Sequence, residues 1–191
     1  MPIPVTLNGS SRMLNAEPGE SLNDVLRREG VLSVRDGCDG EGTCGACAIL
    51  IDGQLVNTCL LVAGQVEGSD LRTVEGLARP LELSSLQTAF VDAGVVQCGY
   101  CTGAMLMAIA QLLEKVQRPT RDEIKDALSG TFCRCTGYEQ IYGAVVLAVP
   151  RRNDPAIPFE MPELRDGPRY VGKPSRTSDG YLLARAQAPR L

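Results

Sequence analysis

The sequence predicts an α+β fold in three parts: a β-rich N-terminal part with one helix, an all-α part, and an extended tail. Apolar and polar side chains alternate in short runs within residues 1–76, which is typical of strands. Apolar side chains recur at helical spacing within residues 77–149. Residues 151–191 hold six of the twelve prolines of this 191-residue chain, too many for a packed core. We therefore expect two small domains and a tail with these boundaries.

The N-terminal part is expected to contain two hairpins. A strand over Ile3–Leu7 precedes turn residues 8–11 and a returning strand over Arg12–Ala16. The second hairpin joins Ala46–Ile51 to Gln54–Val56 through an Asp-Gly turn. The order strand, strand, helix, cysteine-rich loop and hairpin suggests a β-grasp arrangement.

One helix lies between these hairpins. Leu22, Val25 and Leu26 are spaced to form one apolar helical face. Ser21 is the expected N-cap, with an aspartate three residues later, and Gly30 is expected to end the helix.

The middle part predicts four helices joined by short links, which favours a compact antiparallel bundle. The predicted helices are Leu81–Ala93, Thr102–Val116, Thr120–Leu128 and Tyr138–Val149. Asp122 and Glu123 in the first turn of the third helix support its start, because acidic side chains stabilise helix N-termini.

The tail differs in charge from the rest of the chain. It carries eight Lys and Arg against five Asp and Glu, whereas residues 1–150 carry eleven against eighteen. One interpretation is a tail that is disordered in the free chain, as its proline content favours. The other is an extended arm that becomes ordered on a partner.

Composition excludes several classes of function. The chain contains no histidine, which excludes serine–histidine triads, histidine-containing zinc fingers and Rieske centres. Its net charge of −4 argues against nucleic acid as a partner. Neither a G-x-G-x-x-G after a strand nor a P-loop occurs, so flavin and nucleotide sites are expected elsewhere.

The chain is expected to be cytoplasmic and to lack a transmembrane segment. The N-terminus shows no secretory signal, and the apolar run from Gly103 to Leu113 is too short to span a bilayer. A cytosolic chain with eight cysteines more often binds metal than forms disulfides. Export together with a partner that carries its own signal is the alternative.

The eight cysteines form two groups of four. The first group has the spacing C-x5-C-x2-C-x11-C and comprises Cys38, Cys44, Cys47 and Cys59. Plant-type [2Fe–2S] sites have C-x4-C-x2-C and a distant fourth cysteine. Gly37, Gly40, Gly42 and Gly45 provide the unusual backbone angles that a loop around a cluster needs. Zinc is the competing metal, because four thiolates also suit tetrahedral zinc.

The second group has the spacing C-x2-C, 31 residues, C-x-C, and comprises Cys98, Cys101, Cys133 and Cys135. Both pairs lie where a loop enters a predicted helix, and helix N-termini favour an anionic cluster. A cluster with two irons can take one pair per iron, while on ligand chemistry alone zinc remains a rival.

These motifs closely resemble the small iron–sulfur subunit of the molybdenum hydroxylases, the family of xanthine oxidase, aldehyde oxidoreductase and bacterial carbon monoxide dehydrogenase. The similarity covers residues 3–149, and both cysteine frameworks occur in the family's order. The matching stretches are residues 37–47, 56–60, 97–103 and 133–138. The resemblance favours iron–sulfur over zinc at the second group.

The resemblance implies a plant-ferredoxin-like β-grasp domain with one [2Fe–2S] cluster and a four-helix domain with the other. It implies that substrate is hydroxylated at a molybdopterin centre in a large subunit, so no catalytic residue is expected in this chain. Electrons would pass through the helical-domain cluster and the ferredoxin-like cluster, then to FAD in another subunit or to a cytochrome. Aldehydes, purines, other N-heterocycles and carbon monoxide are all substrates within the family.

The resemblance also implies that Gln97 and Cys135 approach the pterin cofactor. From the residues alone, the alternative is that Gln97 is an ordinary amide at a helix end that satisfies a backbone group. The first cysteine loop departs from the family by one extra residue within 39–43, which the glycine-rich loop can absorb. Residues 170–176, with Asp179 and Gly180, resemble the opening of family molybdenum subunits. This suggests that residues 151–191 form an arm along the large subunit.

Two other functions are compatible with the cysteine pattern. One is a free-standing two-cluster ferredoxin that carries electrons between other proteins. The other is a zinc-stabilised interaction module, which would be colourless because zinc–thiolate sites do not absorb visible light.

Overall fold

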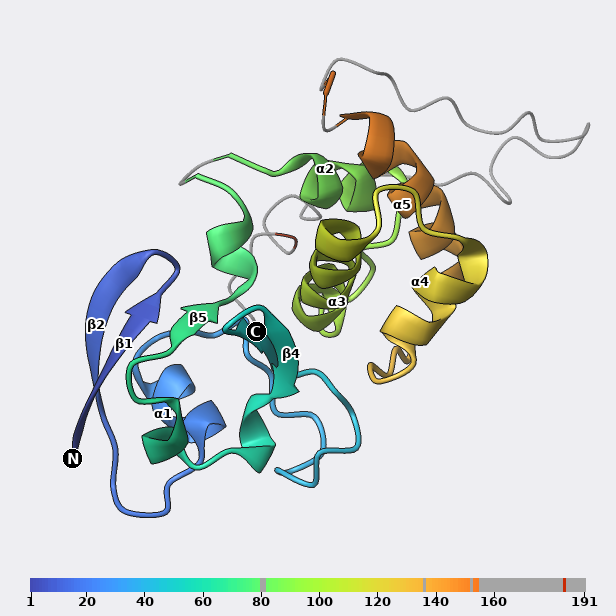
Figure 1. The fold of residues 1–191 in the computed structure, drawn as a ribbon. Coiled ribbons are helices and arrows are strands. Elements are labelled where there is room, and N and C mark those ends of the chain that lie inside the picture. Colours follow the sequence, from blue (N-terminus) through green and yellow to red (C-terminus); the bar gives the residue numbers. More distant parts are fainter. Residues whose placement is uncertain (80–81, 136, 152, 155–183, 185–191) are drawn as a thin grey trace, which may run out of the picture.

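The computed structural model describes residues 1–79, 82–135, 137–151, 153–154 and 184, and it has one mixed sheet and five α-helices (Figure 1). The strands are β1 (Pro2–Leu7), β2 (Ser10–Asn15), β3 (Ala48–Ile51), β4 (Gln54–Asn57) and β5 (Asp70–Arg72). Their order across the sheet is β2-β1-β5-β3-β4, with β1 and β5 parallel and the other neighbours antiparallel. The predicted α+β class is confirmed.

Both predicted hairpins are present, within one or two residues of their expected bounds. Their turns, Asn8-Gly9 and Asp52-Gly53, have positive φ at both central residues, as a tight two-residue hairpin turn requires. The central strand β5 was not predicted. It is three residues long, and it pairs with both β1 and β3.

Helix α1 (Leu22–Arg28) covers the sheet and buries Leu22, Val25 and Leu26 completely. Its predicted N-cap is confirmed: the Ser21 hydroxyl accepts a hydrogen bond from the Asp24 N–H at 3.1 Å. Gly30 follows the helix with φ +87°, a conformation that glycine adopts without steric cost. Three short 3-10 helices complete this part, at Thr58–Leu60, Ala63–Val66 and Val74–Leu77.

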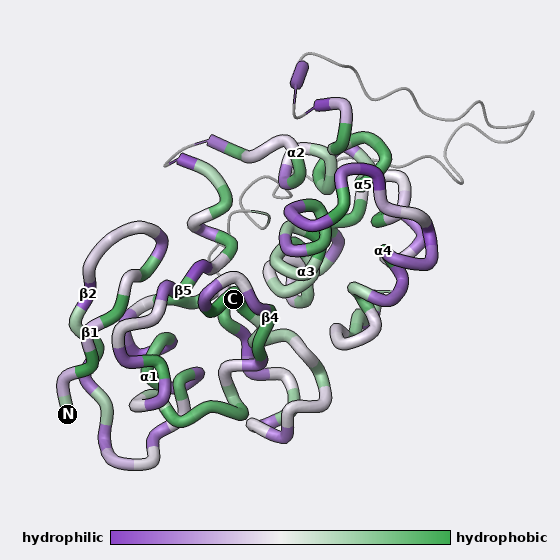
Figure 2. Tube along the Cα trace, in the orientation of Figure 1, coloured by the Kyte–Doolittle hydropathy of each residue, from purple (hydrophilic) through white to green (hydrophobic). Residues whose placement is uncertain are grey.

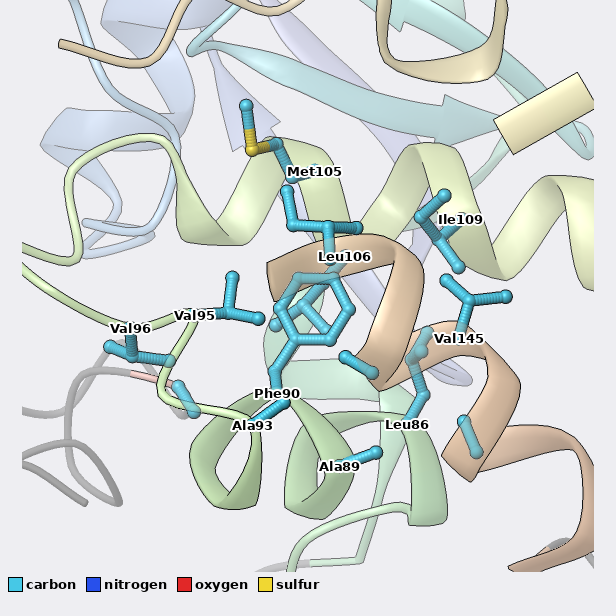
Figure 3. Packing of buried hydrophobic residues seen from close by; sticks show 14 of the residues in the cluster. Leu86, Ala89, Phe90, Ala93, Val95, Val96, Met105, Leu106, Ile109 and Val145 are labelled. Atoms are coloured by element: carbon cyan, nitrogen blue, oxygen red, sulfur yellow. The ribbon is translucent and has the colours of Figure 1, made fainter. Parts of the chain in front are cut away.

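The remaining helices are α2 (Ser85–Asp92), α3 (Thr102–Lys115), α4 (Arg121–Leu128) and α5 (Tyr138–Arg151), and they share a second core. Phe90 of α2 is fully buried, with Leu106 of α3 above it and Val145 of α5 to one side in the view of Figure 3. Helix α4 is mostly hydrophilic (Figure 2) and buries only Ile124 and Leu128.

Two of the predicted helix bounds need correction. The first of these four helices begins at Ser85, not at residue 81, because Ser84 and Gln87 form a capping box that starts the helix there. Residue 81 itself lies outside the described residues. Helix α5 runs beyond Val149 to Arg151, whose buried guanidinium pairs with Asp92 of α2 at 2.6 Å.

The sheet and the helices are packed against each other. Helix α3 lies along β3 and β4, and Leu50 of β3 belongs to the core of the helical part. The Gln111 amide donates a hydrogen bond to the Gly53 carbonyl at 2.8 Å, and Arg72 of β5 pairs with Glu114 of α3. The two parts therefore have separate cores but a shared boundary.

Only a few tail residues are described. Ala184 is fully buried against the helical core, and its carbonyl accepts a hydrogen bond from the Gln87 amide at 3.2 Å. The motif over residues 170–180 lies outside the described residues. Within the described part of the chain, no helix combines the length and the apolar character needed to cross a membrane.

Candidate metal centres

The first cysteine group lies at the edge of the sheet. Cys38, Cys44 and Cys47 are on the loop between α1 and β3, and Cys59 is in the 3-10 helix that follows β4. The thiols of Cys38 and Cys44 hydrogen-bond to each other, and so do those of Cys47 and Cys59. The structure thus brings the four predicted residues together as two pairs.

The loop takes the backbone form that its glycines predicted. Gly40, Gly42 and Gly45 have φ values of +80°, +74° and +68°. Asp39, in the same loop, also has a positive φ, +53°. Consecutive left-handed residues at 39 and 40 bend the loop between Cys38 and Cys44.

Gly37 does not have the positive φ expected of it, and it lies in a tight space instead. A Cβ atom at this position would lie 3.1 Å from Cε1 of Tyr100 and 3.2 Å from Sγ of Cys44. Gly45 has still less room, because its Cβ would lie 1.9 Å from the carbonyl oxygen of Gly130. The loop therefore approaches the helical part closely enough that a side chain is excluded at Gly45, and one at Gly37 would require its neighbours to shift by a few tenths of an ångström.

The surroundings of the first cysteine group shift the pKa values of its thiols in different directions. Hydrogen bonds from the Cys44 backbone, and then from the Cys44 thiol and Thr43, lower the pKa of Cys38 to about 7 despite opposing burial. Burial, and then the hydrogen bond with Cys47, raises the pKa of Cys59 to about 12. Burial also raises the pKa of Cys44, although the Ala46 N–H donates to its sulfur at 3.4 Å. A bound cation must displace protons from these thiols, since thiolates are the ligands.

The second group lies at the N-termini of two helices. Cys98 and Cys101 precede α3, and Cys133 and Cys135 lie between α4 and α5. The Cys101 thiol hydrogen-bonds to that of Cys133, and the Cys98 thiol to that of Cys135. Each contact joins one member of C-x2-C to one member of C-x-C. The sequence had suggested that each motif would serve as a pair.

The thiols of the second group also differ in burial, and burial shifts their pKa values. It is the main cause that raises the pKa of Cys101, followed by the hydrogen bond with Cys133. At Cys135 the Cys98 backbone N–H lowers the thiol pKa, but the hydrogen bond with the Cys98 thiol and burial outweigh it, so the pKa is raised. Cys98 is exposed and Cys135 half-buried, so this pair faces outward.

Tyr138, the first residue of α5, supports the second group and was not predicted to do so. Its hydroxyl accepts a hydrogen bond from the Cys133 N–H at 2.7 Å and donates one to the Thr131 carbonyl at 3.2 Å. The sequence shows a tyrosine after the C-x-C motif, but the contact depends on how the helix folds back over the loop.

Gln97 is exposed and adjoins the outward-facing pair Cys98 and Cys135. A Cβ atom on Gly137, at the start of α5, would lie 3.9 Å from the Gln97 amide nitrogen. The two predicted cofactor-contacting residues, Gln97 and Cys135, therefore lie on the same side of the helical part.

The two cysteine groups meet at the boundary between sheet and helices. The Phe132 N–H donates a hydrogen bond to the Cys44 carbonyl at 2.9 Å, and Phe132 directly precedes Cys133. From the other direction, the Tyr100 hydroxyl donates to the Asp36 carbonyl.

The donor set fits a binuclear cluster at each cysteine group, because the thiol contacts are pairwise. The thiols lie as pairs, which is what a [2Fe–2S] cluster requires, because each of its irons takes two protein ligands. Tetrahedral zinc would need four thiolates around one point.

Comparison with known proteins identifies both parts of the chain. Residues 5–78 match the family model of the 2Fe-2S iron-sulfur cluster binding domain, and residues 73–146 match that of the [2Fe-2S] binding domain. The nicotinate dehydrogenase small FeS subunit of Eubacterium barkeri is 47% identical over 150 residues, which are 78% of this chain and 95% of that subunit. The chain belongs to the small iron–sulfur subunits of the molybdenum hydroxylases.

Longer proteins contain a similar segment. The probable hypoxanthine oxidase XdhD of Escherichia coli K12 is 42% identical over 188 residues, and this chain spans only 20% of its length. Among solved structures, a chain of the quinoline 2-oxidoreductase from Pseudomonas putida 86 aligns with 80% of this chain and over 96% of its own length. The two are 40% identical, with a TM-score of 0.76. The aldehyde oxidoreductase from Desulfovibrio desulfuricans ATCC 27774 matches 99% of this chain and 21% of its own, with 32% identity and a TM-score of 0.86.

Proposed function

We propose that this chain carries electrons from a molybdopterin centre in a large subunit, through two [2Fe–2S] clusters, to a flavin subunit or another acceptor. The observation that carries the proposal is the 2.9 Å hydrogen bond between Phe132 and Cys44, which joins the two cysteine groups across the domain boundary. An electron relay needs its carriers close together in a fixed geometry. Family membership supports the same role, since two relatives are named as iron–sulfur subunits of dehydrogenases and a third as the small subunit of a hydroxylase.

The thiol contacts suggest which cysteines share an iron. The proposed ligand pairs are Cys38 with Cys44, Cys47 with Cys59, Cys98 with Cys135, and Cys101 with Cys133. Bound clusters would supply one-electron carriers at these positions. The chain's own contribution is to hold the sulfurs, donate N–H groups to them, and keep water from the buried pair Cys101 and Cys133.

The outward-facing side of the helical part is the proposed contact with the molybdopterin. Gln97 and Cys135 lie there together, beside the N-terminal end of α5. An amide side chain can both donate and accept hydrogen bonds, which suits the mixed polar edge of a pterin. The large subunit would cover this side.

The proposed domains are a ferredoxin-like β-grasp domain over residues 1–76, a four-helix cluster-binding domain over 77–149, and a tail over 150–191. The tail is proposed to dock on the large subunit, with Ala184 held against this chain's own helices. Truncation after Asp154 should then weaken copurification with the large subunit. Unchanged assembly of the truncated chain would refute the docking.

Metal analysis and low-temperature EPR on the chain, purified with its partners, test the main proposal. We expect about four irons per chain in two distinct reduced [2Fe–2S] signals, together with about one molybdenum per complex. Iron without molybdenum or a copurifying large subunit would instead identify a free-standing ferredoxin. Zinc without visible absorbance would refute both clusters.

Two cysteine variants test the ligand assignment against each other. Cys47→Ala should leave about two irons per chain and remove one EPR signal, and Cys133→Ala should remove the other signal. Each variant is the control for the other, because the two sites have separate ligands. Loss of the same signal in both variants would contradict the assignment.

A further inference from the structure

Tyr100 belongs to one cysteine group by sequence and touches the other by structure. It lies between Cys98 and Cys101, immediately before α3. Its hydroxyl donates a hydrogen bond to the carbonyl of Asp36, 64 residues earlier in the chain and two residues before Cys38. It is the side chain that crosses from the second group to the loop of the first.

The ring of Tyr100 also fills the space that Gly37 leaves open. A Cβ atom on Gly37 would lie 3.1 Å from Cε1 of Tyr100 and 3.4 Å from its hydroxyl oxygen. The same Cβ would lie 3.2 Å from Sγ of Cys44. The Gly37 backbone is thus enclosed between the aromatic ring and a proposed ligand sulfur.

A second contact between the two cysteine groups lies at the other end of the loop segment that begins at Asp36. The Phe132 N–H donates to the Cys44 carbonyl at 2.9 Å, and Gly45 packs against the Gly130 backbone. The segment from Asp36 to Cys44, which contains two proposed ligands, is therefore held at both ends. Both hydrogen bonds come from residues directly before proposed ligands of the second group, Tyr100 before Cys101 and Phe132 before Cys133.

We propose that Tyr100 is a positioning residue that sets the placement of the first cluster relative to the second, and thereby their electronic interaction. This inference rests on the proposed electron-transfer function. The ring alone would give packing, which phenylalanine provides equally well. The hydroxyl adds a directed bond to the backbone of the other domain, and that bond fixes the register of the loop.

The test is Tyr100→Phe in the full chain, purified with its partners. This change keeps the ring and removes the hydrogen bond to Asp36. Tyr142→Phe is the matched control, because it removes a tyrosine hydroxyl from α5, where the ring contacts Arg121 of α4 within the helical domain. Iron content, the magnetic interaction between the two reduced clusters in EPR, and deuterium exchange at the Phe132 amide are measured.

We expect Tyr100→Phe to keep about four irons per chain and both signals. The interaction between the clusters should change, and the Phe132 amide should exchange about fivefold faster, as the loss of one neutral hydrogen bond predicts. Tyr142→Phe should match the wild type in all three measurements.

Two results would overturn the inference. Unchanged magnetic interaction and unchanged exchange in Tyr100→Phe would show that the hydroxyl does not position the loop. Loss of a cluster would show that Tyr100 holds the cluster itself. Failure of the proposed function is distinguishable, because the wild-type chain would then lack one or both cluster signals.

Discussion

Replacing Gly45 by alanine tests whether the loop of the first cysteine group is locked against the helical domain. Gly45 has φ +68°, and an added Cβ would lie 1.9 Å from the Gly130 oxygen and 3.0 Å from the Thr131 Cα. Cβ atoms essentially never approach other atoms within 3.0 Å, so one backbone must move by at least about 1.1 Å. Such a movement breaks the adjacent hydrogen bond from Phe132 to Cys44.

The cost can be worked out from these contacts. A left-handed conformation costs an alanine roughly 1–2 kcal/mol, and losing the hydrogen bond with a buried N–H left unpaired costs about 1–3 kcal/mol more. The smaller entropy of the unfolded alanine chain offsets about 0.4–1 kcal/mol. We expect Gly45→Ala to lower the free energy of unfolding by about 3 kcal/mol.

Gly40→Ala is the matched control in the same loop. Gly40 has φ +80°, but an added Cβ would meet nothing within 4 Å. This variant carries the backbone strain without the collision, and we expect it to cost about 1 kcal/mol. At about 2–4 °C per kcal/mol for a chain of this size, apparent Tm should fall by about 2–4 °C for Gly40→Ala and about 6–12 °C for Gly45→Ala.

The assay is the loss of visible cluster absorbance on heating, at one fixed scan rate and followed in parallel by circular dichroism. A fixed rate matters because cluster loss makes the transition irreversible. Equal shifts for the two variants would refute the reasoning. They would show that strain alone, and no contact with Gly130, determines the loop's stability.

Three further predictions concern the scaffold, all followed by urea unfolding. Arg151→Met should cost about 3–5 kcal/mol because it removes the guanidinium that pairs with the buried carboxylate of Asp92, and adding Asp92→Leu should recover part of the loss; no recovery would contradict the pairing. Thr120→Ala should cost about 1 kcal/mol by removing the N-cap of α4, and an unchanged midpoint would show that the cap contributes nothing. The Arg28 hydrogen bond, followed by one from a backbone N–H, lowers the pKa of Glu20. The ionised Glu20 therefore stabilises the folded chain above the ordinary glutamate pKa of about 4.3, and this stabilisation is lost as pH falls through the lowered pKa. Glu20→Gln should lower the free energy of unfolding at neutral pH but not in acid.

Local signals in the sequence predicted the elements whose structure is decided locally. Ser21 caps α1 as expected, and the Asn-Gly and Asp-Gly pairs form the two hairpin turns, because these preferences act over three or four residues. The start of α2 was placed too early, since apolar spacing continued before Ser84 while the capping box decided the boundary.

Strand β5 could not be predicted in the same way. Its three residues are too few to show alternation, and only Leu71 is buried. Its strand character comes from pairing with β1, more than 60 residues earlier in the chain, and with β3. A single sequence carries no record of such pairings.

The same difference between local and long-range interactions applies to the cysteine groups. Spacing was enough to propose eight ligands in two sets, because a cluster loop is a local structure. Spacing could not indicate that Cys98 contacts Cys135 and Cys101 contacts Cys133, because these contacts depend on how α4 returns the chain to the start of α3. The same folding brings the Tyr138 hydroxyl to the Cys133 N–H.

The boundary between the two domains is where the proposed function depends most on tertiary structure. Each domain has its own core and could hold its own cluster, so cluster binding alone does not require the domains to be locked together. A relay does require it, because transfer between carriers falls steeply with their separation. The contacts of Tyr100, Phe132 and Gly45 all lie within a few residues of proposed ligands on both sides. This placement is what a relay needs, whereas two independent metal-stabilised modules would have no reason to concentrate their contacts there.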